Sequence, residues 1–388
     1  MAALRLVLAM AHARLRQWPA VIAVFFPVVG CKKSPAADAR HDAASVAPLA
    51  TPASASASEA QQPRRSAILV SHETQAMGTS LKLLAYTTDR LDAARTRQAL
   101  LACVSEVERL ETLLSEWRAD SEVSQVNARA GDWVALGPES FEVIRRALWA
   151  GNVSRGSFDI TFQALSGLWR FGSAQEPNPE PPGAAEVARR RKLVDYRRVE
   201  LDAAKRRVRI GADQAIGLGG VAKGYVVDRA AQSLRAAGLK TFLVQAGGDL
   251  YGAGRKPDGS HWVSGIQDPR GGEGELFASL ELEDHAFSTA GDYARSYVVG
   301  GRRYHHIIDP RTGYPATASR SVTVWAIDAT TADVLDDAVF ILGPREGLKL
   351  ASSMQDVGVV IVDAANRVHV SERLKPHVKV LKQPTEGP

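Results

Sequence analysis

Residues 216–249 read IGLGGVAKGYVVDRAAQSLRAAGLKTFLVQAGGD, and this stretch sets the pattern for the whole chain. A glycine-rich turn at Ile216–Tyr225 runs into a helix that is predicted over Ala222–Ala237. A short apolar segment at Thr241–Gln245 is typical of a buried strand, and it ends in a second glycine turn at Ala246–Asp249. The stretch therefore predicts a domain in which helices pack on a sheet.

Further helices and strands are predicted on both sides of this stretch. Apolar residues at helical spacing indicate helices over Asp89–Trp117, Pro138–Ala150 and Thr330–Leu342, and a Pro- and Glu-rich surface loop is expected at 172–185. Strands or hairpins are predicted at 67–86 (around a turn at 77–79), 197–210, 262–266, 276–282, 321–327, 357–362 and 368–370. Strands outnumber the helices available to connect parallel strands. We therefore expect an α+β fold, with mixed or antiparallel sheets and packed helices, in a single domain over residues 67–375.

The segments outside that domain have a different composition. Residues 1–30 contain early arginines and then the apolar run PAVIAVFFPVVG, which is too short to span a bilayer and is typical of a signal peptide. The run ends at Gly30-Cys31, which resembles a bacterial lipobox, so Cys31 is the predicted lipidation site; ordinary secretion with an incidental cysteine is the alternative. The Ala-, Ser- and Pro-rich residues 31–66 predict a disordered tether, and 376–388 a flexible tail. We expect a lipoprotein anchored in a membrane and facing the periplasm or another extracytoplasmic space.

Composition excludes several classes of protein. The net charge of the 388 residues is only +5, and the basic residues are scattered, so we expect no nucleic-acid partner. Two cysteines are too few for a zinc cluster or a disulfide framework. One of them, Cys103, lies in an apolar helical run and is predicted to be a buried small hydrophobe.

The glycine turns indicate a site for a polar ligand. Glycines that lead into a helix allow backbone N–H groups to approach an anion, and Lys223 adds a cation at the same place. The segment is neither a Walker A loop nor a GxGxxG fingerprint. A third glycine turn is expected at Ser288–Tyr293, STAGDY. Each turn alone is as readily an ordinary tight turn, but together they favour a polar ligand.

Three carboxylates are predicted to share one helical face. Asp333, Asp336 and Asp337 lie at positions i, i+3 and i+4 of the segment ADVLDDA. Like charges at about 4 Å repel by ~1 kcal/mol in water and by more near a protein interior. Either the face is fully solvated or a cation neutralises it, and oxygen ligands in this number suit Mg²⁺ or Ca²⁺ rather than zinc.

Two adjacent histidines follow in YHHIIDPRTGYPA, residues 304–316. Neighbouring side chains on a strand point to opposite faces, so at most one of His305 and His306 is expected to reach a site. The sequence contains no HExxH zinc pattern and no GxSxG elbow. Metalloprotease and serine hydrolase chemistry are therefore not predicted.

Taken in order, these motifs resemble the FAD:protein FMN transferases of the ApbE family. The resemblance covers about residues 67–365 and rests on these segments: 77–79, 115–127, 158–172, 217–228, 245–249, 288–293, 304–316 and 332–338. It implies an α+β fold with one flavin site, and FAD and Mg²⁺ as ligands. It also implies transfer of FMN from FAD to a Thr or Ser hydroxyl of a target flavoprotein, with release of AMP.

The resemblance assigns roles to particular residues. The metal positions are Gly220, through a backbone oxygen, and Asp333, Asp336 and Asp337. The positions that contact the flavin dinucleotide are Met77, Trp117, Ser157, Phe158, Asp159, Lys223 and Ile307. His306 and Asp336 are the candidates for the catalytic group that takes the proton of the acceptor hydroxyl.

The sequence departs from the family at several of its site positions. Members usually have Thr where Asp337 stands and Asp where Gly217 stands, and Gln245 and Ala290 replace a common Asn and Ser. Asp337 adds charge to the metal site, and Gly217 removes a contact to FAD. Two alternatives therefore stay open: an FAD pyrophosphatase that gives FMN and AMP, and a flavin-binding lipoprotein without catalysis.

Overall fold

A computed structural model describes residues 66–171 and 180–387. The predicted signal peptide, Cys31 and the tether lie outside these residues, as does part of the loop predicted at 172–185. The largest element is an eight-stranded sheet in the order β1-β2-β6-β7-β10-β15-β16-β17. Its strands are Leu69–Ala76, Thr79–Tyr86, Phe242–Ala246, Asp249–Ala253, His285–Gly291, Ser319–Ala326, Val357–Asp363 and Val368–Val370.

All neighbouring strands of this sheet are antiparallel. A second sheet, in the order β18-β9-β8, packs on one face of the first. Its strands are Val378–Val380, Leu276–Leu282 and Trp262–Gln267. The α+β architecture that the sequence predicts, with antiparallel sheets and packed helices in one domain, is confirmed.

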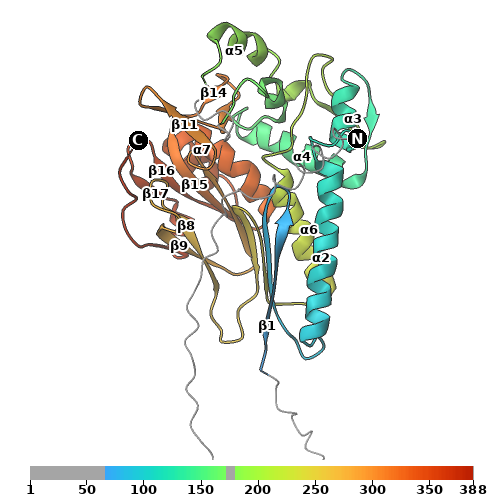
Figure 1. The fold of residues 1–388 in the computed structure, drawn as a ribbon, viewed down its shortest axis with the longest axis vertical. Helices are drawn as coiled ribbons and strands as arrows, with labels where there is room; N and C mark the ends of the chain where they lie inside the picture. Colours follow the sequence, from blue (N-terminus) through green and yellow to red (C-terminus); the bar gives the residue numbers. More distant parts are fainter. Residues whose placement is uncertain (1–65, 172–179, 388) are drawn as a thin grey trace, which may run out of the picture.

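The other face of the large sheet is covered by helices. They are α2 (Ala93–Leu114), α6 (Ala222–Ala236) and α7 (Ala329–Ser352), and α4 (Pro138–Val153) packs in turn on α7. Helix α7 packs across β10, β15 and β16, and α6 packs on β6 and β7, while α2 runs beside β1 (Figure 1). No helix among the described residues is both long enough and apolar enough to cross a bilayer.

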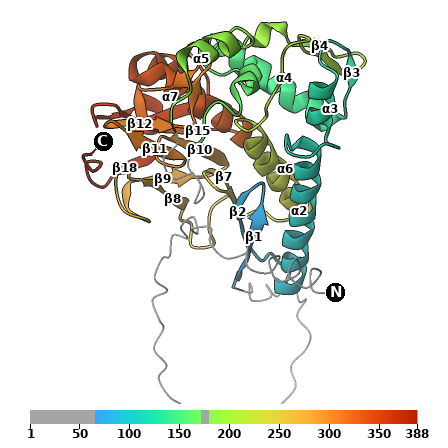
Figure 2. The same ribbon diagram turned by 45° about the horizontal axis from the view of Figure 1, so that its top comes forward.

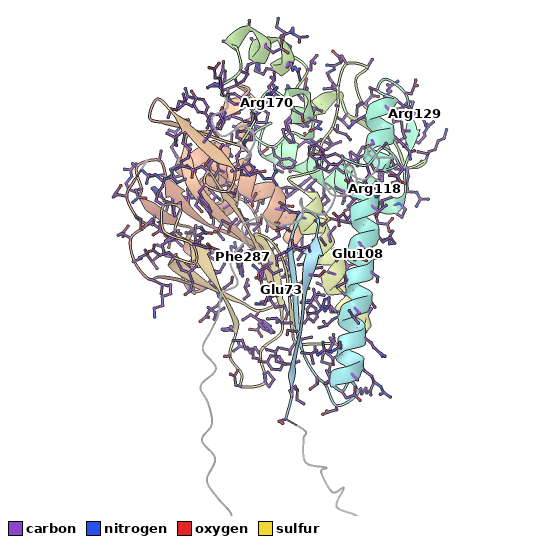
Figure 3. The ribbon with its side chains drawn as sticks, viewed as in Figure 1. Glu73, Glu108, Arg118, Arg129, Arg170 and Phe287 are labelled. Atoms are coloured by element: carbon purple, nitrogen blue, oxygen red, sulfur yellow. The ribbon has the colours of Figure 1, made fainter. Side chains whose placement is uncertain are left out.

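The central strands are apolar on both faces because each face meets a different core. In β6, Phe242 and Val244 pack beneath the helices, whereas Leu243 packs against the small sheet. Strand β16 alternates in the same way and is buried along its whole length. Phe287 of β10 belongs to the core between the two sheets and is labelled in Figure 3. Each fully buried side chain of this size stabilises the fold by roughly 1.5–3 kcal/mol.

Shorter elements gather at one end of the molecule, beyond the end of α2 (Figure 2). The helices among them are α3 (Glu122–Ala128), α5 (Ala184–Arg191), η1 (Ile160–Leu165) and η2 (Tyr196–Arg198), and the strands are β3 (Val134–Ala135), β4 (Glu200–Asp202) and β5 (Arg207–Arg209). The ribbon β13–β14 (Ile308–Asp309, Tyr314–Pro315) packs against η1 and α5. The remaining elements are η3 (Glu372–Leu374) and the ribbon β11–β12 (Ser296–Val299, Arg302–His305). The predicted hairpin at 197–210 is formed by β4 and β5.

Two expectations are corrected by the structure. The glycine turn predicted at Ser288–Tyr293 is wrong, because Ser288–Gly291 is the end of β10 and pairs with β15. The flexible tail predicted at 376–388 is also wrong for the described residues, because β18 pairs with β9. Thr385 beyond it donates both its N–H and its hydroxyl to Asp268, a buried side chain that sequence patterning does not reveal.

Candidate functional site

Two hairpin turns of the large sheet lie side by side. Met77 and Gly78 form the two-residue turn between β1 and β2, with φ angles of +54° and +68°. A methionine in this left-handed region is strained by roughly 1–2 kcal/mol, and such strain is typical of ligand-binding turns. Gly247 of the turn between β6 and β7 donates its N–H to Ser80 O at 3.0 Å. The turn at Met77 thus adjoins the AGGD turn of the sequence.

The start of α6 places Lys223 between two buried carboxylates. Its Nζ lies 2.7 Å from Asp249 Oδ2 and 3.2 Å from Asp333 Oδ1. Burial disfavours its charge, but these two carboxylates together hold the pKa of Lys223 well above its usual value. The N–H of Gly224 donates to Asp333 Oδ2 at 2.8 Å. Asp333 on α7, Lys223 on α6 and Asp249 on β7 therefore form one cluster.

Asp336 joins the cluster through Ser288 of β10. The Ser288 hydroxyl lies 2.6 Å from both Asp336 Oδ2 and Asp249 Oδ1. A hydroxyl donates only one proton, so the second short contact requires a proton on one of the two carboxyls. Burial and the charges of Asp337 and Asp333 raise the pKa of Asp336.

Asp337 lies on the side of α7 that faces the glycine turn. A Cβ atom on Gly220 would be 3.0 Å from Asp337 Oδ2 and 3.0 Å from Phe158 Cε2. Burial raises the pKa of Asp337 and of Asp333, and Asp249 adds to the effect in both while Lys223 acts against it. One ammonium therefore faces four carboxyl groups, which leaves the cluster short of positive charge.

This donor set fits a hard cation only in part. Within 66–171 and 180–387, no three His, Cys, Asp or Glu side chains surround a common point as metal ligands do. The reason is that Lys223, the Gly224 N–H and Ser288 already occupy oxygens of Asp333 and Asp336. Asp337 has no such partner among the described residues, and it lies beside Gly220. The surplus of buried negative charge also fits a divalent cation.

The two histidines diverge, as their adjacency predicts. His305 is buried, and its Nε2 lies 2.7 Å from Ala316 O. His306 is half-buried, and its Nδ1 has no partner among the described side chains. Burial, Arg295 and, more weakly, Lys223 lower the pKa of His306 to about 4. His306 is thus the one of the pair that lies near the charges of the site.

The remaining predicted positions differ in what their side chains do. Phe158 lies beside Gly220, and Trp117 is 85% exposed in the loop after α2, close to the labelled Arg118 in Figure 3. Asp159 accepts hydrogen bonds from Thr161 and from the N–H of Tyr196, so both of its oxygens hold loops together. The implied flavin positions Ser157 and Ile307 are both buried, and Ser157 Oγ has no partner among the described residues.

Some neighbours of the site escape prediction from the sequence. Asp249 closes the Gly247-Gly248 turn and Ser288 opens the STAGDY motif. Both residues therefore lie in glycine-containing motifs, but these motifs predict only turns and not a place in the cluster. Glu116 stands next to Trp117, again within a quoted motif. No pattern marks Arg295, which acts on both His306 and Glu116.

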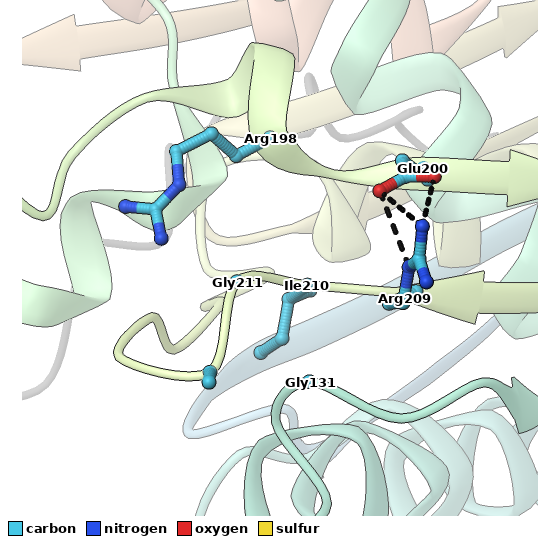
Figure 4. A pocket seen from close by; sticks show the side chains of 7 residues that line it. Gly131, Arg198, Glu200, Arg209, Ile210 and Gly211 are labelled. Carbon is cyan, nitrogen blue, oxygen red and sulfur yellow. Dashed lines mark hydrogen bonds and ion pairs between the residues drawn. The ribbon is translucent and has the colours of Figure 1, made fainter.

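One surface pocket lies away from this cluster. It has a volume of about 300 Å³ and is lined by Gly131, Arg198, Glu200 and residues 209–212 at the β4–β5 hairpin (Figure 4). Its Arg209 is paired with Glu200 and its Arg198 with Asp213, so neither guanidinium lacks a counter-charge. None of the predicted site residues lines this pocket.

Known proteins resemble this chain over most of its length. The family model described as "ApbE family" matches residues 77–361. The FAD:protein FMN transferase of Treponema pallidum is 31% identical over 79% of this chain and 87% of its own length. The crystal structure of the ApbE protein of Thermotoga maritima superposes with a TM-score of 0.72 at 32% identity, covering 80% of this chain and 99% of that one. The flavin transferase ApbE of Vibrio cholerae gives a TM-score of 0.69 at 26% identity, with the same coverage.

Proposed function

Because this chain belongs to the ApbE family, we propose that it transfers FMN from FAD to a target flavoprotein, with a Thr or Ser hydroxyl as the acceptor and Mg²⁺ as the metal. The observation that supports this most directly is the cluster of Lys223 with Asp249, Asp333, Asp336 and Asp337 beside the glycine turn. Such a cluster suits a substrate whose reacting part is a pyrophosphate.

Each part of the cluster has a task in this proposal. Lys223 and the backbone N–H groups at the start of α6 attract the pyrophosphate of FAD. Asp337 and the backbone oxygen of Gly220 hold Mg²⁺, with Asp333 and Asp336 beside them. When bound, Mg²⁺ neutralises charge on the phosphate oxygens. Phe158 and the exposed Trp117 offer flat apolar surfaces to the isoalloxazine ring.

The proposed reaction breaks one bond and forms another. The acceptor hydroxyl oxygen forms a bond to the phosphorus on the FMN side, while the bridging P–O bond breaks and AMP leaves with the electron pair. The hydroxyl proton passes to His306, which is neutral above about pH 5 because its pKa is lowered to about 4. Its Nδ1, which has no partner among the described residues, supports His306 over Asp336, whose Oδ2 is already engaged by the Ser288 hydroxyl.

A flavinylation assay tests the proposal. The purified domain, FAD, Mg²⁺ and an acceptor flavoprotein should give an acceptor band that still shows flavin fluorescence after denaturation. One AMP should be released for each flavin attached. EDTA should abolish the band, and added Mg²⁺ should restore it. AMP released without any acceptor would show a pyrophosphatase instead, and tight FAD binding with no AMP at all would show a flavin carrier.

We also propose that Cys31 anchors the protein in a membrane facing an extracytoplasmic space. The support is the sequence alone, namely the apolar run that ends at Gly30-Cys31 and the Ala-, Ser- and Pro-rich residues after it. Cells expressing the full chain should incorporate labelled palmitate into it, and Cys31→Ala should abolish the label. An unlabelled wild-type chain would favour ordinary secretion.

A further inference from the structure

The carboxylate of Glu116 lies directly against Gly217, where the glycine turn into α6 begins. A Cβ atom on Gly217 would be 2.6 Å from Glu116 Oε2 and 2.8 Å from Gln163 Oε1. Real Cβ atoms do not approach other atoms so closely. A side chain at position 217 would therefore force the ends of the Glu116 and Gln163 side chains to shift from the positions they hold here.

One oxygen of the Glu116 carboxyl is not satisfied by the described residues around it. Its Oε2 is buried and has no hydrogen-bond partner in the described part of the chain. Burial raises the pKa of the Glu116 carboxyl, while the Leu218 N–H and the charge of Arg295 act in the opposite direction. A buried acceptor without a donor is costly, and native structures pair nearly all such groups with protein, ordered water or a ligand.

The surroundings of Glu116 connect it with the rest of the site. The next residue, Trp117, is 85% exposed. Gly220, three residues after Gly217, lies beside Phe158 and Asp337. Arg295 affects the pKa of both Glu116 and His306. The unpartnered acceptor therefore lies among the groups proposed to hold the flavin and the metal.

We propose that Glu116 is a substrate-binding residue whose carboxylate accepts a hydrogen bond from an uncharged hydroxyl or N–H group of bound FAD. The phosphates of FAD are anionic, so a carboxylate pairs only with its sugar hydroxyls, its adenine amine or its isoalloxazine N–H. Family members usually carry an Asp at the position of Gly217. In this chain, Glu116 from the loop after α2 places its carboxylate there instead. This inference rests on FAD being the ligand of the site.

The test is a double-mutant cycle at Glu116 and Gly217, with the dissociation constant for FAD measured by flavin fluorescence. Glu116→Ala should weaken FAD binding by about tenfold or more, since a hydrogen bond to a charged acceptor is lost. Gly217→Asp alone should also weaken binding, because the new Cβ collides with Glu116. In Glu116→Ala/Gly217→Asp the collision is removed and a carboxylate returns, so FAD should bind at least about fivefold more tightly than to either single variant.

Controls separate a binding role from a structural one. Asp120→Asn removes an exposed carboxylate from the same loop and should bind FAD as the wild type does. Glu116→Gln keeps the side-chain volume and guards against loss of fold, which the melting temperature monitors. The dissociation constants of Glu116→Ala for AMP and for FMN locate the hydrogen-bond donor. Weaker binding of AMP alone assigns the donor to the adenosine half of FAD, and weaker binding of FMN alone assigns it to the flavin half.

Two results would overturn the inference while leaving the function intact: equal FAD affinity of wild type, Glu116→Ala and Glu116→Gln, or no rescue in the double variant. If the wild-type protein itself fails to bind FAD, the proposed function fails first, and the two failures are thereby told apart.

Discussion

The ammonium of Lys223 and the carboxylate of Asp249 form a 2.7 Å ion pair that joins α6 to the large sheet. Asp249 is 1% exposed, and the second partner of the lysine, Asp333, is 2% exposed. The pair lies where the strand turns meet the two central helices. It therefore links the stability of the fold to the charge balance of the site.

Replacing Lys223 should reduce both stability and ligand binding. Lys223→Met leaves Asp249 and Asp333 buried without their cation, which we expect to cost about 3 kcal/mol in the free energy of unfolding. Urea denaturation measures this cost, and fluorescence titration should show weaker FAD binding. Lys240→Met, at an exposed position, is the control and should change neither. Unchanged stability in Lys223→Met would contradict the role of the ion pair.

Asp337→Thr should relieve the charge surplus of the cluster. The variant removes a carboxyl whose pKa burial raises, so without metal we expect the protein to become more stable by about 1 kcal/mol at pH 7. The same loss of charge should weaken Mg²⁺ binding, which isothermal titration calorimetry measures. Asp89→Thr, at an exposed position with a negative φ, serves as the control. Tighter Mg²⁺ binding by Asp337→Thr would contradict this expectation and show that a Thr hydroxyl serves the metal better than the carboxylate does.

His306→Gln should slow FMN transfer without weakening FAD binding. Loss of a general base lowers kcat by roughly 10²-fold or more. In the wild type, kcat should fall as the pH drops through about 4, where His306 becomes protonated, and this acid limb should be absent in the variant. Stopped assays between pH 3.5 and 8 test this, with His305→Gln as a comparison for packing effects. A variant with full kcat would assign the proton to another group.

The C-terminal residues should stabilise the domain in a pH-dependent way. Burial disfavours ionised Asp268, but the Arg270 N–H, Thr385 and Lys382 outweigh it and lower its pKa to about 2. The stabilisation is therefore fully present above the ordinary pKa of about 3.9 and is lost as the pH falls through 2. Asp268→Asn should cost about 2 kcal/mol at pH 7 and less below pH 3. A cost that does not depend on pH would point to packing alone.

Prediction from the sequence succeeds where apolar residues recur at the spacing of a helix or a strand. The helix predicted at Thr330–Leu342 is the part of α7 that precedes a break at Gly343-Pro344, where Gly343 has a φ of +73°. The short strands within Ala67–Tyr86 are equally clear, because a Met-Gly turn divides them.

Prediction fails where a contact is made between distant segments. The motif at Ser288 was expected to be a turn because it contains glycine, but pairing with β15 keeps it extended. Helical spacing correctly groups Asp333 with Asp336 and Asp337. It does not reveal that Ser288, Lys223 and Asp249 reach the same place, because the sheet order brings them there. The partnership of Glu116 with Gly217 is likewise visible only in three dimensions.

The order of strands in the large sheet has a consequence for how the molecule acquires its ligand. β2 and β6 are direct neighbours in the sheet, although β2 ends at Tyr86 and β6 begins only at Phe242. The two hairpin turns of the site therefore come from distant parts of the sequence. Such pairing of distant segments is slow to form, and no fragment of the chain contains the complete site. FAD should therefore recognise only the finished protein and stabilise it by mass action, so that occupancy by the dinucleotide reports completion of folding.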